Sequence, residues 1–466
     1  MSALDLTIVL VYITGLFIVG ISVGVRENAE DFLVLSRRAG FFLVLSSVVS
    51  SWVGVGMFVG TSASAYQTGI SLGLTGAAGA LVAVLAAGIF APRVKAFGDY
   101  YKAHTLGDFL VVRYSSHVSR ASAVVIILVY LLLTGVQFTG LSALLQVWSG
   151  VGFTGAMIIT AISTIVYTAF AGIKSDFYTD AIHFVVMVLV LFGLLLPRLW
   201  SATDAFTALK TLPHSYFEPF AFGGIGYFIG GLVLGVAIVF VSMDIWQRIY
   251  ASSSGETARS ALVASGFVIV PFYVLAVAIG LAARSLNPRI VDTNLTLFVI
   301  MRDYLPTGLL GLGIASFIAL FVSSANTTMM VVSATVTKDI IAERASRRSD
   351  GKVVNLLLTG RVTTILAGLG GLVISFYVRS IVTLSVVAIF LLLVLLPAVL
   401  GGFYWQKATA RGALWSIVGG SVAYAAALPF SATNAFIPGF LVSVGVFVVV
   451  SLATSHSPTE TIIQST

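Results

Sequence analysis

The feature that most constrains this chain is a succession of apolar runs, each about 20 residues long, the length of helix that crosses a bilayer. Only 9% of the residues are charged, whereas a soluble domain carries roughly a quarter. The runs lack the alternation of membrane strands, which excludes an outer-membrane barrel. We therefore predict an all-α polytopic membrane protein of about thirteen transmembrane helices, at residues 4–25, 41–65, 70–91, 121–148, 152–171, 179–199, 223–245, 261–283, 308–336, 354–378, 381–403, 412–428 and 436–453.

The basic residues predict how the chain lies in the membrane. Lys and Arg concentrate in the cytoplasmic loops of membrane proteins. With the N-terminus outside, 19 of the 25 Lys and Arg residues fall in cytoplasmic segments and six fall outside. We therefore predict an outside N-terminus, a cytoplasmic C-terminus and a location in the plasma or inner membrane. Because these residues lie in short loops, the net charge of +7 does not indicate nucleic acid as a partner.

The segments between the spans carry little chemistry of their own. Segment 105–114 is amphipathic, with Thr105 as the expected N-cap and Asp108 at the third helical position. A short lid helix is expected at 294–301, and 344–352 is a basic loop. The sequence has no nucleophile–base pattern, no phosphate-binding loop and no cysteine, so we predict that the protein is not an enzyme.

The ninth apolar run is unusually polar for a membrane helix. At 100° per residue, Ser323, Asn326 and Thr327 share one face and Ser324 lies beside them. Such side chains can simply bond their own helix backbone or join neighbouring helices. The alternative is a site for a hard cation, which prefers oxygen ligands.

The second run contains glycines and β-branched residues at mid-membrane, in the segment 50–56 (SSWVGVG). A continuous helix is weak there. Transporters break helices at the bilayer midplane so that freed carbonyl groups can coordinate an ion. A glycine-rich packing face is the other interpretation. The run therefore predicts either a broken helix at an ion site or a close helix contact.

Acidic groups occur near the ends of the sixth and seventh runs. Asp180 and His183 lie on one helical face, either as an interfacial pair favoured by the helix dipole or as an ion or proton site. Asp244 lies four residues before Arg248. A local ion pair between them and a role of Asp244 in binding substrate or protons both remain open.

Five segments, in this order, resemble the solute:sodium symporter family, which includes proline, sialic acid and sodium/glucose carriers. They are 50–66 (SSWVGVGMFVGTSASAY), 167–183 (YTAFAGIKSDFYTDAIH), 246–251 (WQRIYA), 322–340 (VSSANTTMMVVSATVTKDI) and 396–414 (LPAVLGGFYWQKATARGAL). The resemblance implies a LeuT-type core of two inverted five-helix repeats with one extra N-terminal and two extra C-terminal helices. The implied parts are an N-terminal helix and loop at 1–39, repeats at 40–200 and 201–411, and the C-terminal pair at 412–466.

The resemblance also implies the ion sites. The main sodium site would use backbone carbonyls and two hydroxyls, at Ser50, Val53, Leu320, Ser323 and Ser324. A second sodium or a proton would use Asp180, Asn326 and Thr327, where Asn326 replaces the serine that such relatives carry. The implied coupling ion is Na⁺.

The substrate positions match the family least well. They fall on Trp52, Met57, Phe58, Gln137 and Asp244. This set offers few partners for sugar hydroxyls, so a small solute such as an amino acid or a short organic acid is expected. The predicted function is sodium-driven import of a small organic solute by alternating access, with a single chain as the functional unit in the lipid bilayer. Proton coupling through Asp180 and His183 is the alternative, and a channel or a solute sensor is a third class.

Overall fold

The computed structural model describes residues 2–24, 28–170, 172–203, 209–343, 355–377 and 380–454. All regular structure within these ranges is helical, and the one strand-like contact found there is an isolated bridge between Ala39 and Ser252. The first part of the chain forms α1 (Ala3–Gly24), α2 (Ala29–Val34), η1 (Leu35–Arg37), α3 (Phe41–Trp52), α4 (Val55–Thr68), α5 (Ser71–Tyr101), α6 (Leu106–Arg113), α7 (Ser116–Ser149), α8 (Phe153–Phe170), α9 (Ile173–Met187), η2 (Val188–Leu195) and α10 (Leu196–Thr203).

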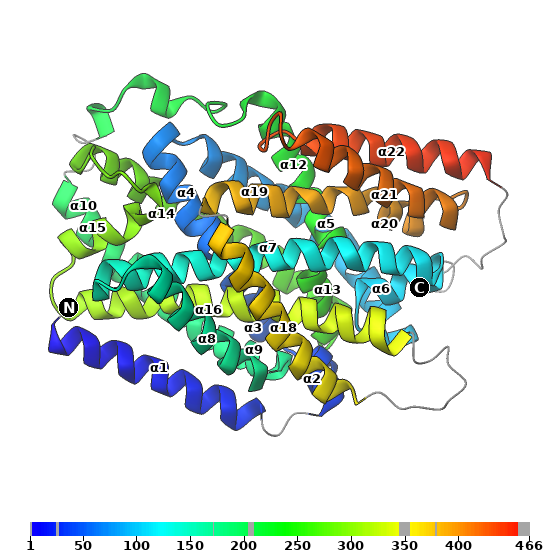
Figure 1. Cartoon of the computed structure of the whole chain (residues 1–466), viewed down its shortest axis with the longest axis horizontal. Coiled ribbons are helices and arrows are strands. Elements are labelled where there is room, and N and C mark those ends of the chain that lie inside the picture. Colours follow the sequence, from blue (N-terminus) through cyan, green and yellow to red (C-terminus); the bar gives the residue numbers. More distant parts are fainter. Residues whose placement is uncertain are drawn as a thin grey trace.

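The second part of the chain continues the same bundle. Figure 1 shows α7 and α16 running through its middle, with α1 along one edge and the α21–α22 pair along the opposite one. The elements are η3 (His214–Phe217), α12 (Gly224–Val241), α13 (Met243–Ala251), α14 (Gly255–Leu286), η4 (Thr293–Leu295), α15 (Thr296–Tyr304), α16 (Leu309–Thr335), η5 (Val336–Ala342), α18 (Leu356–Tyr377), α19 (Ile381–Leu391), η6 (Leu392–Leu395), α20 (Leu396–Tyr404), α21 (Ala410–Ala427) and α22 (Phe436–Ala453).

The predicted all-α membrane architecture is confirmed. In the described part of the chain, eleven helices are long and apolar enough to cross a bilayer, and α3 with α4 adds a twelfth if the bent pair crosses as one span. The predicted span at 412–428 is helical as α21 but is not one of these. Its glycines, serines and tyrosine make α21 less apolar than the other spans.

Two spans are broken, and both breaks position the site. The axis bends by 46° between α3 and α4, as the sequence of residues 50–56 predicts. The break between α12 and α13 at Ser242, whose φ of −82° and ψ of 114° are extended, was not predicted from the sequence. Paired interrupted helices in corresponding halves are typical of inverted-repeat transporters. The repeat boundaries at 40–200 and 201–411 stay a prediction.

Some helices approach so closely that only glycine fits between them. A Cβ on Gly235 of α12 would lie 2.2 Å from the Gly79 carbonyl oxygen of α5. Small residues allow such backbone contact in membrane bundles.

Two of the predicted connecting features are present. Thr105 and Asp108 form a reciprocal capping box at the start of α6, and α15 lies where the lid helix was expected. The basic loop 344–352 lies outside the described residues.

Candidate functional site

The break between α3 and α4 faces the polar stretch of α16. Val53 follows the last residue of α3 with a φ of −78° and a ψ of 61°. This backbone conformation is not helical, so the helix stops there. The Ser324 hydroxyl donates to the Ser51 carbonyl at 2.8 Å and approaches the Ser50 carbonyl at 3.4 Å. A Cβ on Gly54 would lie 2.3 Å from Ser324 Oγ. Glycine at position 54 therefore lets α16 reach the backbone of the broken helix.

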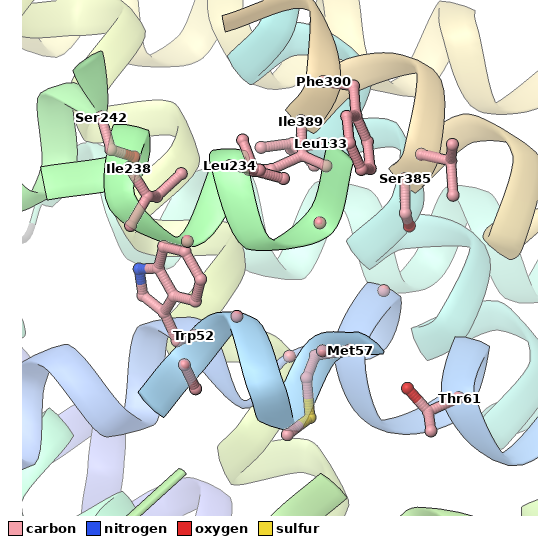
Figure 2. A pocket seen from close by; sticks show the side chains of 18 of the residues that line it. Trp52, Met57, Thr61, Leu133, Leu234, Ile238, Ser242, Ser385, Ile389 and Phe390 are labelled. Atoms are coloured by element: carbon pink, nitrogen blue, oxygen red, sulfur yellow. The ribbon is translucent and has the colours of Figure 1, made fainter. Parts of the chain in front are cut away.

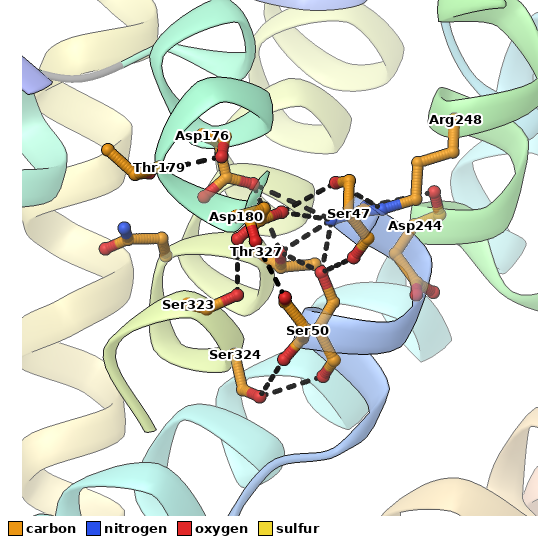
Figure 3. Close-up of polar contacts among 12 residues, drawn as sticks. Ser47, Ser50, Asp176, Thr179, Asp180, Asp244, Arg248, Ser323, Ser324 and Thr327 are labelled. Carbon is orange, nitrogen blue, oxygen red and sulfur yellow. Dashed lines mark hydrogen bonds and ion pairs between the residues drawn. The ribbon is translucent and has the colours of Figure 1, made fainter. Parts of the chain in front are cut away.

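The five positions expected for the main sodium site are all buried. Ser323 donates a hydrogen bond to the Asp180 carboxylate of α9, and Ser324 bonds the end of α3 (Figure 3). The hydroxyl groups of Ser323 and Ser324 thus lie between the helix break and a carboxylate. Hydroxyl, carbonyl and carboxylate oxygens are the ligands that hard cations prefer. The positions in this set are Ser50, Val53, Leu320, Ser323 and Ser324.

Arg248 of α13 lies at the centre of the polar contacts beside this break. Its guanidinium donates to Ser47 at 3.0 Å and to Ser51 at 2.5 Å, both on α3, and to Thr327 of α16 at 2.8 Å. Figure 3 shows the side chain reaching from α13 toward α9. Four helices are therefore joined by one buried cation.

Arg248 also contacts two carboxylates of α9. Its Nη2 lies 3.6 Å from an oxygen of Asp176 and 3.6 Å from an oxygen of Asp180. All three side chains are at most 4% exposed. We call Arg248, Asp176 and Asp180 the charge cluster. Its formal charge is −1 when both carboxyls are ionised, and a buried charge without a partner is costly.

The local ion pair between Asp244 and Arg248 is not formed. Arg248 donates to the backbone carbonyl of Asp244 at 3.2 Å, while its guanidinium turns to the two carboxylates of α9. The Asp244 carboxylate instead accepts from Tyr130, from Ser242 at 2.6 Å and from the Trp52 indole at 3.2 Å. The guanidinium thus lies nearer to the two buried carboxylates of α9 than to the carboxylate of Asp244 in its own helix.

The three positions expected for a second ion do not converge. The Asn326 side chain accepts from Thr168 of α8 and also interacts with Asp176. Thr327 contacts Arg248 and, at 3.2 Å, Asp176. Asn326 and Thr327 thus share Asp176, whereas the Asp180 carboxylate accepts from Ser47 and Ser323 and lies beside Arg248.

His183 and Asp180 also face different neighbours. The His183 Nδ1 lies 2.6 Å from the Tyr12 hydroxyl of α1, whereas Asp180 contacts Ser47 and Ser323. Their shared helical face does not bring their polar groups together. No hydrogen bond between Asp180 and His183 is found among the described residues, so a proton could not pass directly from one side chain to the other.

A cavity of about 230 Å³ lies between α4, α7, α12 and α19 (Figure 2). Four of the five residues expected to bind substrate line it, namely Trp52, Met57, Gln137 and Asp244. The fifth, Phe58, does not line this cavity. Its ring is fully buried against α16, with the ring centroid 5.6 Å from that of Phe317.

A second cavity of about 530 Å³ adjoins the first, and both are lined by Val382 and Val386 of α19. Gln67, Asp292 and Thr293 give this second cavity a more polar lining. These residues belong to segments that the charge distribution predicts to be extracellular. The central cavity therefore has a neighbouring space on the predicted outer side.

A layer of ionic contacts covers the predicted cytoplasmic side. Arg37 pairs with Glu30 at 3.4 Å and with Asp99 at 3.6 Å, and Lys95 pairs with Asp99 at 2.7 Å. Burial lowers the pKa of His104, whose ring lies 2.7 Å from Glu30, while that contact opposes the shift. Burial alone would raise the pKa of Glu30, but His104 and Arg37 hold it below its usual value. These contacts join α2, α5 and the loop before α6.

A profile of the sodium:solute symporter family matches residues 32–420. That match covers most of the chain, so the chain belongs to this family. It is 25% identical to a sodium/glucose cotransporter of Vibrio parahaemolyticus, over 94% of this chain and 86% of that one. It is 24% identical to a sodium/pantothenate symporter of Escherichia coli (strain K12), over 93% and 92%. It is also 26% identical to a urea-proton symporter of Oryza sativa subsp. japonica, over 57% of this chain and 41% of that one.

Solved structures support the same architecture. A Na⁺-coupled sialic acid symporter in a substrate-bound outward-open state matches with a TM-score of 0.80 and 18% identity, over 97% of this chain and 98% of that one. Mhp1, a nucleobase-cation-symport-1 family transporter, matches with a TM-score of 0.59 and 14% identity, over 90% and 94%. These likenesses establish the LeuT-type fold. Together with the family match, they identify a secondary active symporter and not an enzyme.

Sequence reasoning missed several members of the polar network, among them Asp176 and Tyr130. Asp176 was not singled out, although it precedes Asp180 by one helical turn on the same face. Tyr130 was missed because an isolated tyrosine in an apolar helix carries no signal of its own. Spacing along α9 could have revealed Asp176, whereas Tyr130 required the packing of α7 against α13.

Proposed function

We propose that this symporter is driven by sodium and imports a small organic solute by alternating access. The observation that carries the proposal is the meeting of the α3 break with Ser323 and Ser324 of α16. The break frees backbone carbonyls in the middle of the membrane. Ser324 bonds them, and the adjacent Ser323 bonds Asp180. Sodium would bind the carbonyls of Ser50, Val53 and Leu320 and the hydroxyls of Ser323 and Ser324.

The charge of the surroundings favours a cation at this place. Ser323 bonds Asp180, which belongs to a charge cluster with one more carboxylate than guanidinium. A monovalent cation beside Asp180 would neutralise the excess. Because the five expected ligands are neutral hydroxyl and carbonyl oxygens, which bind sodium but do not take up a proton, we favour sodium over a proton as the coupling ion.

We propose that only one sodium binds. Arg248 contacts Asp180 and Thr327, two of the three groups expected for a second ion, and also Asp176 beside them. Its guanidinium already supplies the positive charge there, and a second cation would be repelled. The Asn326 amide, which would be the third ligand, is held by Thr168.

The two broken spans provide the physical link between ion and solute. On α3, Trp52 lines the cavity and Ser50 lies at the ion site. On α13, Asp244 lines the cavity and Arg248 joins the charge cluster one turn later. Movement of either helix on solute binding would therefore alter the ion site. By linkage, sodium and solute must raise each other's affinity by the same factor.

The sodium site is tested without knowledge of the solute. NaCl, compared with KCl at equal ionic strength, should raise the midpoint of thermal unfolding of the purified protein. Ser323→Ala should require roughly ten times more sodium for the same shift, because a ligand and a charge-assisted hydrogen bond are lost. Ser316→Ala is the matched control, since this buried serine of α16 bonds only the Gly313 carbonyl among the contacts described. An unchanged sodium response in Ser323→Ala would reject the site.

Proton coupling is the second candidate because a relative is a urea-proton symporter. In this chain it would use Asp180, with His183 held apart by Tyr12. Solute uptake into proteoliposomes under a pH gradient in sodium-free buffer would support it. A strict requirement for sodium would exclude it.

We propose an outside N-terminus and a cytoplasmic C-terminus, with one chain as the functional unit in the plasma or inner membrane. The absence of cysteine from the sequence makes the orientation testable with single introduced cysteines. Val291, which is 98% exposed, lies in a predicted outer segment, and Arg259 lies in a predicted inner one. An impermeant thiol reagent should label Val291→Cys in intact cells and Arg259→Cys only after permeabilisation. The reverse pattern would invert the topology.

A further inference from the structure

The central cavity contains a carboxylate that no basic side chain neutralises. Asp244 lines the cavity and is 5% exposed. Its oxygens accept hydrogen bonds from the hydroxyls of Tyr130 and Ser242 and from the Trp52 indole, all neutral donors. Within the described segments it forms no ion pair, and the cavity lining contains no Lys, Arg or His. The cavity is therefore a negatively charged binding space.

Neutral donors alone leave this carboxylate only partly stabilised. A buried charge is costly unless it is paired as well as hydrogen-bonded. The nearby Arg248 does not pair with the Asp244 carboxylate, because its guanidinium donates to the Asp244 backbone carbonyl and lies against the carboxylates of Asp176 and Asp180. The counter-charge for Asp244 must then come from whatever occupies the cavity.

The walls around Asp244 suit an organic cation. Trp52 projects into the cavity beneath Ile238 (Figure 2). Its indole N–H donates to the Asp244 carboxylate at 3.2 Å. Aromatic faces attract ammonium groups, most strongly when water is excluded. Farther from the carboxylate the lining becomes apolar, with Leu234, Ile238 and Phe390 from two different helices.

We propose that the solute is a small organic cation whose ammonium group binds at Asp244. Its hydrocarbon part lies against Leu234, Ile238 and Phe390. The inference rests on the proposed symporter function and specifies the solute for its cavity. Short organic acids, part of the expectation from sequence, are disfavoured because their carboxylate would face Asp244 and find no basic partner.

The test uses three probes of matched size with the purified full-length protein. They are n-butylammonium, n-butanol and butyrate, each added in NaCl and in KCl. We expect n-butylammonium to raise the unfolding midpoint, and to do so more in NaCl, with no comparable effect of n-butanol or butyrate. An equal or larger effect of the alcohol or the acid overturns the proposal, and so does the absence of any response to the ammonium probe. A response to the neutral alcohol alone would indicate that Asp244 carries a proton.

Variants locate the response. Asp244→Asn should weaken the apparent affinity for n-butylammonium by roughly 30-fold, as expected when one partner of a buried charge pair is removed. Asp244→Glu, which keeps the negative charge, should recover part of the affinity for n-butylammonium. Asp303→Asn removes an acid on α15 whose carboxylate pairs with Arg302, and it should bind as the wild type does. If Asp244→Asn retains the full response, the site is wrong.

The same measurements separate this proposal from the proposed function. The midpoint shift from NaCl alone depends on Ser323 and not on the added probe. Sodium stabilisation without any preference for the ammonium compound would reject the cationic solute and leave the sodium site standing. Ammonium binding that is independent of both sodium and Ser323 would support the cavity and reject sodium coupling.

Discussion

Two acidic regions contact α13 one helical turn apart, one at Asp244 itself and the other, formed by carboxylates of α9, at Arg248, and they bury charge in opposite ways. In the charge cluster, Asp176 and Asp180 share Arg248 and are surrounded by hydroxyl groups. At the central cavity, Asp244 has three neutral donors and no cation among the described residues. The carboxylates of the first region have a basic partner within the protein, and the carboxylate of the second has none within the described segments. Each region carries one excess negative charge when its carboxyls are ionised. In the cluster that charge is shared with a guanidinium, whereas at the cavity Asp244 has no basic partner in the part of the chain that the structure describes, so the proposed solute would be its only counter-charge.

The largest expected effect comes from removing the shared cation. Arg248→Leu leaves Asp176 and Asp180 buried without a basic partner, which costs about 3–5 kcal/mol. The unfolding midpoint of the purified protein should fall sharply, and Arg248→Lys should restore part of it. If Arg248→Leu is as stable as the wild type, the ion pairs of Arg248 do not stabilise the charge cluster. The cluster would then not differ from Asp244 in having its charge neutralised by a basic side chain.

A smaller effect is expected from crowding the ion site. The Cβ of Gly54→Ala would lie 2.3 Å from Ser324 Oγ, so Ser324 must move away from the α3 carbonyls. Overpacking of this kind costs about 1–3 kcal/mol. The sodium-induced rise in the unfolding midpoint should weaken while binding of n-butylammonium in KCl is retained. Gly15→Ala is the control, because a Cβ there meets no atom within 4 Å.

The smallest effect is expected outside both regions. Tyr12→Phe removes the hydrogen bond to His183, worth about 0.5–1.5 kcal/mol of stability. Sodium dependence and the response to n-butylammonium should both be unchanged. A marked change in the pH dependence of transport in this variant would bring His183 into the mechanism and favour proton coupling.

The fold could be predicted from the sequence because lipid imposes a simple rule. A chain in a bilayer must satisfy its backbone internally, so apolar runs become helices. The position of the α3–α4 break followed from the weak helix propensity of residues 50–56. The break at Ser242 could not be foreseen in the same way, because the preceding α12 is strongly apolar and no proline marks its end.

Site features that depend on the periodicity of a single helix could be predicted from the sequence. Contacts between side chains of different helices could not. Periodicity alone placed Ser323, Asn326 and Thr327 on one face of α16 with Ser324 beside them, and the family resemblance supplied the expected role of Ser323 and Ser324 as ion ligands. The choice of Arg248 between Asp244 and the acids of α9 depends on how three helices pack. The contacts of Asn326 with Thr168 and of Phe58 with Phe317 likewise depend on packing between helices and could not be read from the sequence.

The glycine contact between α5 and α12 limits how the protein can move. With the Gly79 carbonyl only 2.2 Å from where a Gly235 Cβ would be, there is no side-chain layer along which the two helices could slide. They should behave as one mechanical unit, and the nearest joint in the chain is the extended backbone at Ser242. Asp244 and Arg248 both lie just beyond that joint. A small rotation about Ser242 would therefore carry the solute's counter-charge and the shared guanidinium together, without disturbing the glycine contact.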